Sequence, residues 1–211
     1  MVEFHIVNLR DFGKGSYRQI DDTPFGGGSG MVLMAEPLFK AIDHAIDLVG
    51  GPDNVRVIYP SPQGKTWNQD IAEETSQQEK LIVICGHYKG IDERVMEKYV
   101  THEYSLGDFV MTGGEIPAMV MLDSTVRLIP GTLNNLDSAL TDSFSQDLLD
   151  HPHYTHPREI DGMEVPEVLL GGYHAKIEAW RQEQKEKRTQ EKKPDLWEKF
   201  EKIKESEINH A

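Results

Sequence analysis

The sequence has very little cysteine and no long apolar run. Cys85 is the single cysteine among 211 residues, so the chain can form neither an internal disulfide nor a thiolate-rich metal site. No apolar run approaches the roughly eighteen residues of a membrane-spanning helix, and Met1 is followed by no basic and apolar leader. These absences argue against a disulfide-rich secreted domain and against a membrane protein, and they predict a cytoplasmic location.

Positive charge is also scarce, and it is unevenly distributed. The net charge is −14, with 22 Lys and Arg against 36 Asp and Glu, which argues against a uniformly basic nucleic-acid-binding surface. Residues 174–193 depart from this balance, with seven Lys or Arg against four Glu. A solvated helix face and a surface that contacts phosphates explain this stretch about equally well.

Several motifs of catalysis and cofactor binding are missing. The chain has no Gly-x-Ser-x-Gly motif and no Gly-Lys-Ser/Thr phosphate loop, and the glycine run at 26–30 lacks the spacing of a dinucleotide fingerprint. His151, His153 and His156 lie within six residues, but their spacing does not suit one helical face and no His-Glu-x-x-His motif accompanies them. The sequence therefore predicts turn and surface histidines, and no metal site.

What the chain does contain is an alternation of strand and helix patterns. Strands alternating with helices predict an α/β domain with a parallel sheet. Two charged helices at 174–190 and 194–206 predict a small second domain. Before them, the strand patterns occupy residues 2–6, 55–59 and 81–85, and the helix patterns occupy residues 37–49, 67–78, 91–99 and 115–128.

Three glycine-bearing loops lie close together between residues 81 and 117, at 86–90, 105–108 and 112–114. Glycine is placed where the backbone needs a positive φ or approaches a ligand closely. In a parallel sheet, ligands bind beyond the carboxyl ends of the strands, where these loops and a turn at 61–64 are expected. The sequence thus predicts a pocket for a small molecule, although ordinary strand-to-helix turns would explain any one loop.

Eight motifs in order along nearly the whole chain carry a resemblance to a known family: Asn8–Phe12, Asp21–Met31, Ser61–Gly64, Gly86–Arg94, Ser105–Asp108, Gly113–Glu115, Thr141–Phe144 and His151–Thr155. Together they resemble bacterial tRNA (guanine-N1)-methyltransferases of the SPOUT superfamily. The resemblance implies an α/β fold whose parallel sheet has a C-terminal trefoil knot, an exception to the usual topology rules, followed by a small helical C-terminal domain.

The resemblance also implies a domain organisation. Residues 1–133 would form the knotted domain that binds S-adenosylmethionine, 134–147 the interdomain linker, and 148–211 the helical tRNA-contact domain. In the family a further strand and helix precede the residue that matches Val2, and these are absent from this sequence. Their loss is expected to expose apolar surface.

The activity that the resemblance implies is transfer of a methyl group from S-adenosylmethionine to N1 of guanosine 37 in tRNA. The implied partners are tRNA, the methyl donor and a second copy of the chain, with no membrane. In this homodimer the base of one subunit would complete the pocket of the other. The residues implied to bind the cofactor are Tyr59, Ser61, Pro62, Gly86, Tyr88, Gly90, Ser105, Leu106, Gly107, Asp108, Phe109, Val110, Met111, Gly113, Gly114 and Pro117.

Two residues match the family's catalytic positions. Guanine N1 carries a proton at neutral pH, so a carboxylate must remove it before the nitrogen can act as a nucleophile. Asp142 matches this general base, and Arg127 matches the guanidinium that stabilises negative charge on O6. Without the family, an Asx-turn or helix N-cap would explain Asp142, and a helix-end cation would explain Arg127.

The resemblance gives the basic stretch a role and leaves one position altered. Residues implied to contact tRNA are His153, Lys176, Arg181, Lys185 and Arg188. Lys89 stands where the family has a glutamate associated with magnesium, and an ammonium group cannot ligate a cation. This argues against Mg²⁺ as a cofactor. It also leaves an alternative open, a catalytically impaired relative that binds tRNA or S-adenosylmethionine.

Overall fold

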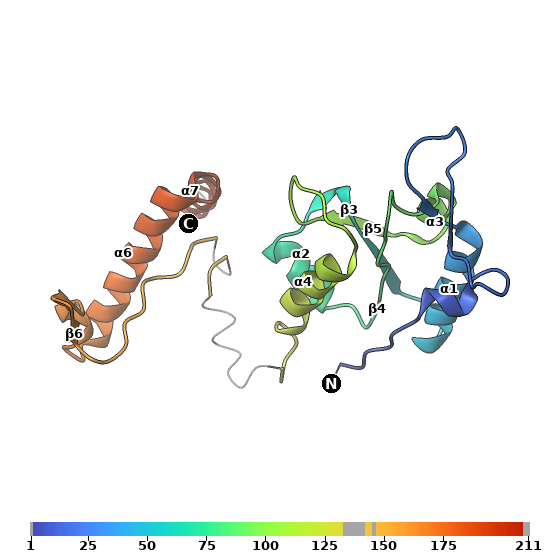
Figure 1. Ribbon diagram of the computed structural model, residues 1–211. Helices are drawn as coiled ribbons and strands as arrows, with labels where there is room; N and C mark the ends of the chain where they lie inside the picture. Colours follow the sequence, from blue (N-terminus) through green and yellow to red (C-terminus); the bar gives the residue numbers. More distant parts are fainter. Residues whose placement is uncertain (1, 133–141, 145–146, 209–211) are drawn as a thin grey trace. The chain divides into compact units, whose positions relative to one another are not determined.

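The computed structural model describes residues 2–132, 142–144 and 147–208 of the chain. It divides into two compact units, Met1–Asn134 and Asn135–Ala211. Figure 1 draws both units coloured along the sequence.

The N-terminal unit is an α/β structure built on a three-stranded parallel sheet with the order β4-β3-β5. A short antiparallel pair, β1 and β2, accompanies the sheet. In chain order the elements are η1 (Leu9–Phe12), β1 (Asp21–Asp22), β2 (Val32–Leu33), α1 (Ala35–Leu48), β3 (Val55–Thr66), α2 (Gln69–Ser76), β4 (Lys80–Val83), α3 (Glu93–Tyr99), β5 (His102–Ser105) and α4 (Glu115–Val126).

Helices cover both faces of this sheet, because successive strand residues point to opposite sides. Val57 and Tyr59 of β3 pack in one apolar cluster with residues of α1 and α3. Ile58, between them, packs in a second cluster with residues of α2 and α4. The sheet is therefore the middle of three layers, with α1 and α3 on one side and α2 and α4 on the other (Figure 1). The predicted parallel α/β architecture is confirmed.

Local signals account for the helix boundaries. The Asn68 side chain caps α2 by accepting a hydrogen bond of 3.0 Å from the Ile71 backbone N–H. Asp92 begins α3 in the same way, with the Arg94 N–H as the donor. Pro37 lies in the first turn of α1, where its missing N–H costs nothing. None of the described helices combines the length and the apolarity needed to cross a bilayer.

Two expectations for strands are wrong. Residues 2–6 form no strand, and Phe4 and Ile6 are 61% and 97% exposed. Their alternating pattern has no partner strand among the described residues, and a strand without a partner gains no ladder hydrogen bonds. The predicted turn at 61–64 does not end β3 either, because the strand continues through it to Thr66.

The C-terminal unit consists of a small hairpin and two long helices. Its elements are β6 (Glu159–Ile160), β7 (Met163–Glu164), η2 (Glu167–Leu169), α6 (His174–Lys192) and α7 (Pro194–Ile208). The two predicted helices are confirmed as α6 and α7, which pack on each other. The hairpin was not expected from the sequence. Its turn has positive φ at both Asp161 and Gly162.

Candidate active site

A cavity of about 150 Å³ lies in the N-terminal unit, beyond the ends of β4 and β5 and beside β3. Its lining comes from three stretches of chain that are far apart in sequence. The lining residues are Tyr59, Pro60, Ser61, Pro62, Gly86, His87, Tyr88, Lys89, Gly90, Tyr104, Ser105, Leu106, Gly107, Phe109, Val110, Met111, Thr112, Gly113, Gly114 and Pro117.

The first wall exists because β3 bulges at residues 61–64. Pro60 and Lys65 both pair with Tyr104 of β5, so the residues between them are looped out of the ladder. The bulge requires Gly64, since a Cβ atom there would lie 2.4 Å from the Tyr104 backbone nitrogen. The looped residues thereby turn toward the cavity instead of continuing a regular strand.

The turn at 86–90, which follows β4, forms the second wall. A Cβ atom on Gly86 would lie 2.8 Å from the Tyr59 hydroxyl oxygen, so glycine permits this close packing. Tyr88 has a φ of 60°, a value that non-glycine residues rarely adopt and that turns the chain sharply. Burial, helped by Glu103, raises the pKa of Tyr59, so its phenol remains a neutral hydrogen-bonding group at the cavity.

Residues 105–117 provide the third wall and seal it against the second. The Ser105 hydroxyl donates to the Gly107 carbonyl at 3.0 Å and accepts from the Gly107 N–H at 3.1 Å, which closes the loop. The Gly114 N–H donates to the Gly86 carbonyl at 2.8 Å. A Cβ atom on Gly114 would lie 2.7 Å from the Gly86 nitrogen, so these two loops touch through their backbones.

A side-chain pair joins the same two loops. His87 Nε2 lies 2.8 Å from a carboxylate oxygen of Glu115, in the first turn of α4. Burial, together with the Glu115 charge, raises the pKa of the Cys85 thiol, which disfavours the thiolate. The Cys85 thiol is therefore poorly suited to act as a nucleophile.

The cavity lining contains all but one of the residues expected to bind the cofactor. The exception is Asp108, which is exposed at a tight turn where the Phe109 N–H donates to the Gly107 carbonyl. Sequence reasoning missed Pro60, His87, Lys89, Tyr104 and Thr112. All five lie inside or next to the stretches that it singled out, so proximity to those loops was the available signal.

The two residues expected to be catalytic belong to different units. Arg127 is the C-cap residue of α4, partly buried, and its backbone N–H donates to the Asp123 carbonyl at 3.2 Å. Asp142 belongs to the C-terminal unit and is also partly buried.

Hydrogen bonds tie the segment that follows Asp142 to helix α6. The Asp150 N–H donates to the Ser143 hydroxyl at 2.9 Å, which joins Asp150 to the residue next to Asp142. The neighbouring Leu149 N–H donates to Thr189 Oγ1 of α6 at 2.8 Å. Thr189 is completely buried, so water does not compete for this bond.

Four of the residues expected to contact tRNA lie on α6, and they differ in how accessible they are. Lys176 is exposed. Arg181 pairs with Glu178 at 2.6 Å, and Arg188 donates to a main-chain carbonyl at 3.5 Å. Arg181, Lys185 and Arg188 are partly buried, so Lys176 is the most open of the four to a phosphate.

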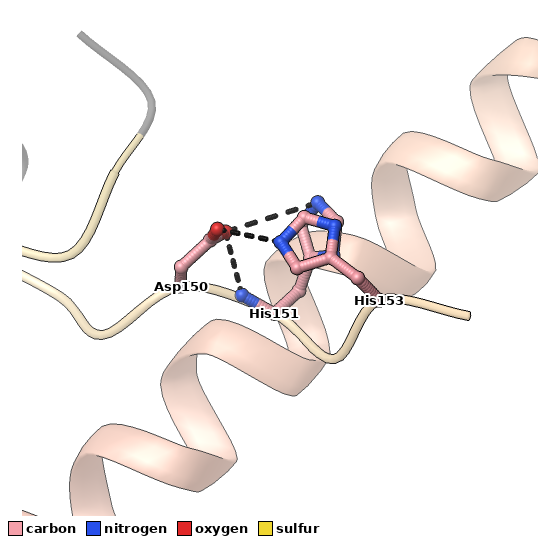
Figure 2. Close-up of side chains that lie close together, drawn as sticks. All are labelled: Asp150, His151 and His153. Atoms are coloured by element: carbon pink, nitrogen blue, oxygen red, sulfur yellow. Dashed lines mark hydrogen bonds and ion pairs between the residues drawn. The ribbon is translucent and has the colours of Figure 1, made fainter. Parts of the chain in front are cut away.

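His153, the fifth of these residues, lies in a cluster with Asp150 and His151 (Figure 2). His153 Nε2 is 2.8 Å from Asp150 Oδ2, and His151 Nε2 is 3.8 Å from Asp150 Oδ1. Burial acts to raise the Asp150 pKa, but hydrogen bonds from His153 and from the His151 backbone outweigh it, so the pKa lies below its ordinary value. His156 is exposed and lies outside this cluster.

Comparison with known proteins identifies the family. The family described as tRNA (Guanine-1)-methyltransferase TrmD matches residues 1–199. The tRNA (guanine-N(1)-)-methyltransferase of Brevibacillus brevis is 52% identical over 200 residues, which cover 95% of this chain and 81% of that protein. The proteins of the same name from Staphylococcus carnosus and Clostridioides difficile are 53% and 48% identical, covering 95% and 94% of this chain and 80% and 86% of their own lengths. The chain therefore belongs to the tRNA (guanine-1)-methyltransferase family.

Proposed function

We propose that this protein is an S-adenosylmethionine-dependent enzyme that methylates N1 of guanosine 37 in tRNA. The observation that carries the proposal is the meeting of the three glycine-bearing loops, 86–90, 105–108 and 112–114, at one cavity. Relatives about 50% identical over nearly the whole chain, named for guanine-N1 methylation of tRNA, support it.

The residues of the cavity suit S-adenosylmethionine. Backbone N–H and C=O groups of the loops at 86–90 and 105–114 can hydrogen-bond an adenine edge, and the apolar side chains of Leu106 and Pro117 can cover its ring. The sulfonium of the bound cofactor would supply an electrophilic methyl group. We assign the lining residues predicted from the sequence to this cofactor, with Pro60, His87, Lys89, Tyr104 and Thr112 added and Asp108 left out.

Asp142 acts as the general base in this proposal. Its carboxylate accepts the N1 proton. The freed lone pair of N1 would then bond to the methyl carbon while the carbon–sulfur bond of the sulfonium breaks, leaving the neutral thioether S-adenosylhomocysteine. A positioned base of this kind contributes about 10²–10⁴-fold to the rate. The bond from the Asp150 N–H to the Ser143 hydroxyl supports this role, because it fixes the residue next to Asp142.

Arg127 stabilises the charge that this proton transfer creates. When N1 loses its proton, negative charge spreads to O6 of the guanine, and a guanidinium offers planar, permanently charged donors to that oxygen. Arg127 is the C-cap of α4, at the opposite end of this helix from Gly114, which lines the cavity; the assignment therefore rests on the match to the family and not on proximity to the cavity.

A homodimer completes the site. Ile116, Met119 and Val120 on α4 are 63%, 67% and 44% exposed, and Phe109 and Val110 at the cavity are 54% and 85% exposed. Large apolar side chains gathered around one cavity are typical of a surface that a partner covers. A second copy of the chain placed there would bring its own Asp142 to the pocket.

The finer fold and domain assignments follow the same family. Residues 1–133 bind the cofactor, residues 134–147 link the domains and residues 148–211 contact tRNA. The enzyme acts in the cytoplasm. Residues 133–141, 145–146 and 209–211 lie outside the part of the chain that the structure describes. The knot itself is inferred from the family. The Gly114–Gly86 hydrogen bond and the His87–Gly113 bridge are compatible with it, because they join the third loop to the second.

Magnesium is not assigned to position 89. The Lys89 ammonium has no lone pair to offer a cation. Its side chain instead lies against the glycine run, where a Cβ atom on Gly30 would come within 3.0 Å of Lys89 Cγ.

Methyl transfer tests the proposal directly. Purified protein, unmodified tRNA with guanosine at position 37 and methyl-labelled S-adenosylmethionine should give labelled N1-methylguanosine. Asp142→Asn should reduce transfer by about 10²–10⁴-fold with cofactor binding retained. Asp161→Asn is a matched control, because Asp161 lies in the exposed turn between β6 and β7.

Two outcomes would contradict the proposed enzyme. If cofactor and tRNA bind without transfer and Lys89→Glu restores it, the chain is an impaired binding relative. If Asp161→Asn lowers transfer as much as Asp142→Asn, the base has been assigned to the wrong carboxylate.

A further inference from the structure

We propose that Asp150, His151 and His153 bind one dication of the first transition series, such as Zn²⁺ (Figure 2). The ligand atoms that the three side chains offer all lie within 4.8 Å of one another. The site lies in the C-terminal unit and is distinct from the cavity between the glycine-bearing loops.

The spacing of the ligand atoms is close to what such an ion needs. Metal–ligand bonds of roughly 2.0–2.1 Å place neighbouring ligand atoms roughly 3.0–3.4 Å apart. The distances from Asp150 oxygens to His153 and His151 Nε2 are 2.8 and 3.8 Å, on either side of that range. The His153 side chain is 68% exposed and can rotate, whereas Asp150 and His151 are 22% and 13% exposed and define the position.

The His151 ring already has the tautomer that a metal ligand requires. Its Nδ1 lies 3.1 Å from the Pro152 carbonyl oxygen. A carbonyl can only accept a hydrogen bond, so the neutral ring carries its proton on Nδ1 and keeps a lone pair on Nε2. Nε2 is the nitrogen that faces Asp150, and a carbonyl bonded to the far nitrogen is the usual support of a metal-binding histidine.

Contacts outside the cluster hold the backbone of Asp150 in place. The Asp150 N–H donates to the Ser143 hydroxyl at 2.9 Å, and the Asp150 carbonyl accepts from Arg188 at 3.5 Å. The preceding residue is bonded to buried Thr189. Little rearrangement is therefore needed to bind an ion, and less freedom is lost when it binds.

The donor set decides which kind of ion the site takes. Two imidazole nitrogens and one carboxylate oxygen favour Zn²⁺, Co²⁺ or Ni²⁺, whereas Mg²⁺ and Ca²⁺ prefer oxygen ligands. Three protein ligands leave at least one position for water. The spacing of His151, His153 and His156 does not suit one helical face, which is why the sequence predicts no metal site. The cluster uses Asp150 in place of His156, in an extended segment.

Direct ion binding tests this proposal. Full-length, tag-free protein is titrated with Zn²⁺ by calorimetry, and with Co²⁺ by its visible absorption. One Zn²⁺ per chain is expected. Loss of a ligand exceeds the 10–100-fold effect of losing a supporting contact, so His153→Ala and Asp150→Asn should each weaken binding by at least about 10-fold. His156→Ala, which removes a neighbouring exposed histidine, should leave binding unchanged.

Three results would overturn the proposal. Absence of saturable Zn²⁺ binding would mean that the cluster is hydrogen-bonded only. An equal loss on His156→Ala would mean scattered binding to surface histidines, and equally tight Mg²⁺ binding would exclude the assigned ligand chemistry. Far-ultraviolet circular dichroism of each variant separates loss of ligand from loss of fold. Because only ion binding is measured, the result tests the metal site independently of the proposed methyl transfer.

Discussion

Each of the two units of this chain is stabilised internally by a different kind of interaction. The N-terminal unit buries apolar side chains in two clusters, one on each face of its parallel sheet. Among the described residues of the C-terminal unit, only Leu148 and Thr189 are fully buried. That unit relies instead on two charged helices and on hydrogen bonds from side chains such as Thr189 and Ser143.

The difference matters for function, because the cavity and the proposed base are positioned by different means. Close-packed interiors transmit small displacements and hold their neighbours to fractions of an ångström, which suits a cavity formed by backbone loops. Hydrogen-bonded segments have fewer contacts and open more readily. The Asp142 segment therefore depends on a few polar bonds that single substitutions can remove.

The largest effect is expected when a core side chain of the N-terminal unit is truncated. Ile58 is 0% exposed, so Ile58→Ala should lower the free energy of unfolding of this unit by about 2–5 kcal/mol. Hydrogen exchange of peptides from each unit during denaturant unfolding measures the loss separately. Leu148→Ala is the counterpart in the C-terminal unit and should act there alone. Equal loss of protection in both units after Ile58→Ala would show that they unfold as one.

The next effect concerns the cavity. In Gly114→Ala the new Cβ atom would meet the Gly86 nitrogen at 2.7 Å and the Cys85 Cα at 2.9 Å, so backbone must move. Because displacement near 1 Å can cost 10²-fold, we expect cofactor affinity to fall by about 100-fold in a direct binding titration. Gly171→Ala is the control, since its Cβ makes only an ordinary contact at 3.5 Å with Tyr173 in the other unit. If the cofactor affinity of Gly114→Ala is unchanged, the contact between Gly114 and Gly86 is not needed for cofactor binding.

A smaller, local effect is expected from the buried hydroxyl of the C-terminal unit. Thr189→Val keeps the shape of the side chain but leaves the Leu149 N–H without its acceptor, which costs about 1–3 kcal/mol. Exchange of the Leu149 amide should accelerate, and Thr189→Ser should restore protection. Thr125→Val in α4 is the matched control, because that hydroxyl only donates to the Met121 carbonyl of its own helix. If the Leu149 amide exchanges at the same rate in Thr189→Val and in Thr125→Val, Thr189 does not hold this segment.

The same contrast explains what the sequence could predict. Helices α1 to α4, α6 and α7 follow from local periodicity and end signals, and the order of strands and helices is enough to indicate a parallel sheet. That sheet brings strand ends to one edge, so most of the cavity lining could be anticipated from glycine-bearing loops. The Asp161-Gly162 pair was also a local hairpin signal, and it was overlooked.

The other failures are non-local. The bulge in β3 depends on how Pro60 and Lys65 share Tyr104, which only the paired strand determines. The alternating pattern at residues 2–6 favours a strand, but it does not determine whether another strand pairs with it. The cluster of Asp150 with His151 and His153 depends on the path of an extended segment, for which the sequence has no periodic pattern. The loop contact of His87 with Glu115 likewise joins residues that are far apart in sequence.

The smallest effect is expected from acid titration at the surface of the N-terminal unit. Glu36 lies 2.6 Å from the Lys14 ammonium and 3.0 Å from that of Lys40, and these hydrogen bonds and charges lower its pKa from 4.5 to about 2. A lowered folded-state pKa stabilises the fold above the unfolded-state value, so this contribution should be lost as the pH falls from 4.5 toward 2. The Glu36 carboxyl is solvent-exposed, and salt should weaken the effect further.

Thermal unfolding of the wild type and of Glu36→Gln across that pH range measures this contribution. The wild type should lose more stability on acidification than the variant, in the N-terminal unit only, and the difference should shrink at high salt. Glu79→Gln is a matched control, because Glu79 is exposed and lies in the loop between α2 and β4. An identical acid response of the wild type and Glu36→Gln would mean that Lys14 and Lys40 do not hold this carboxylate in solution. The stability of the N-terminal unit would then rest on its apolar clusters, with no measurable part from this surface ion pair.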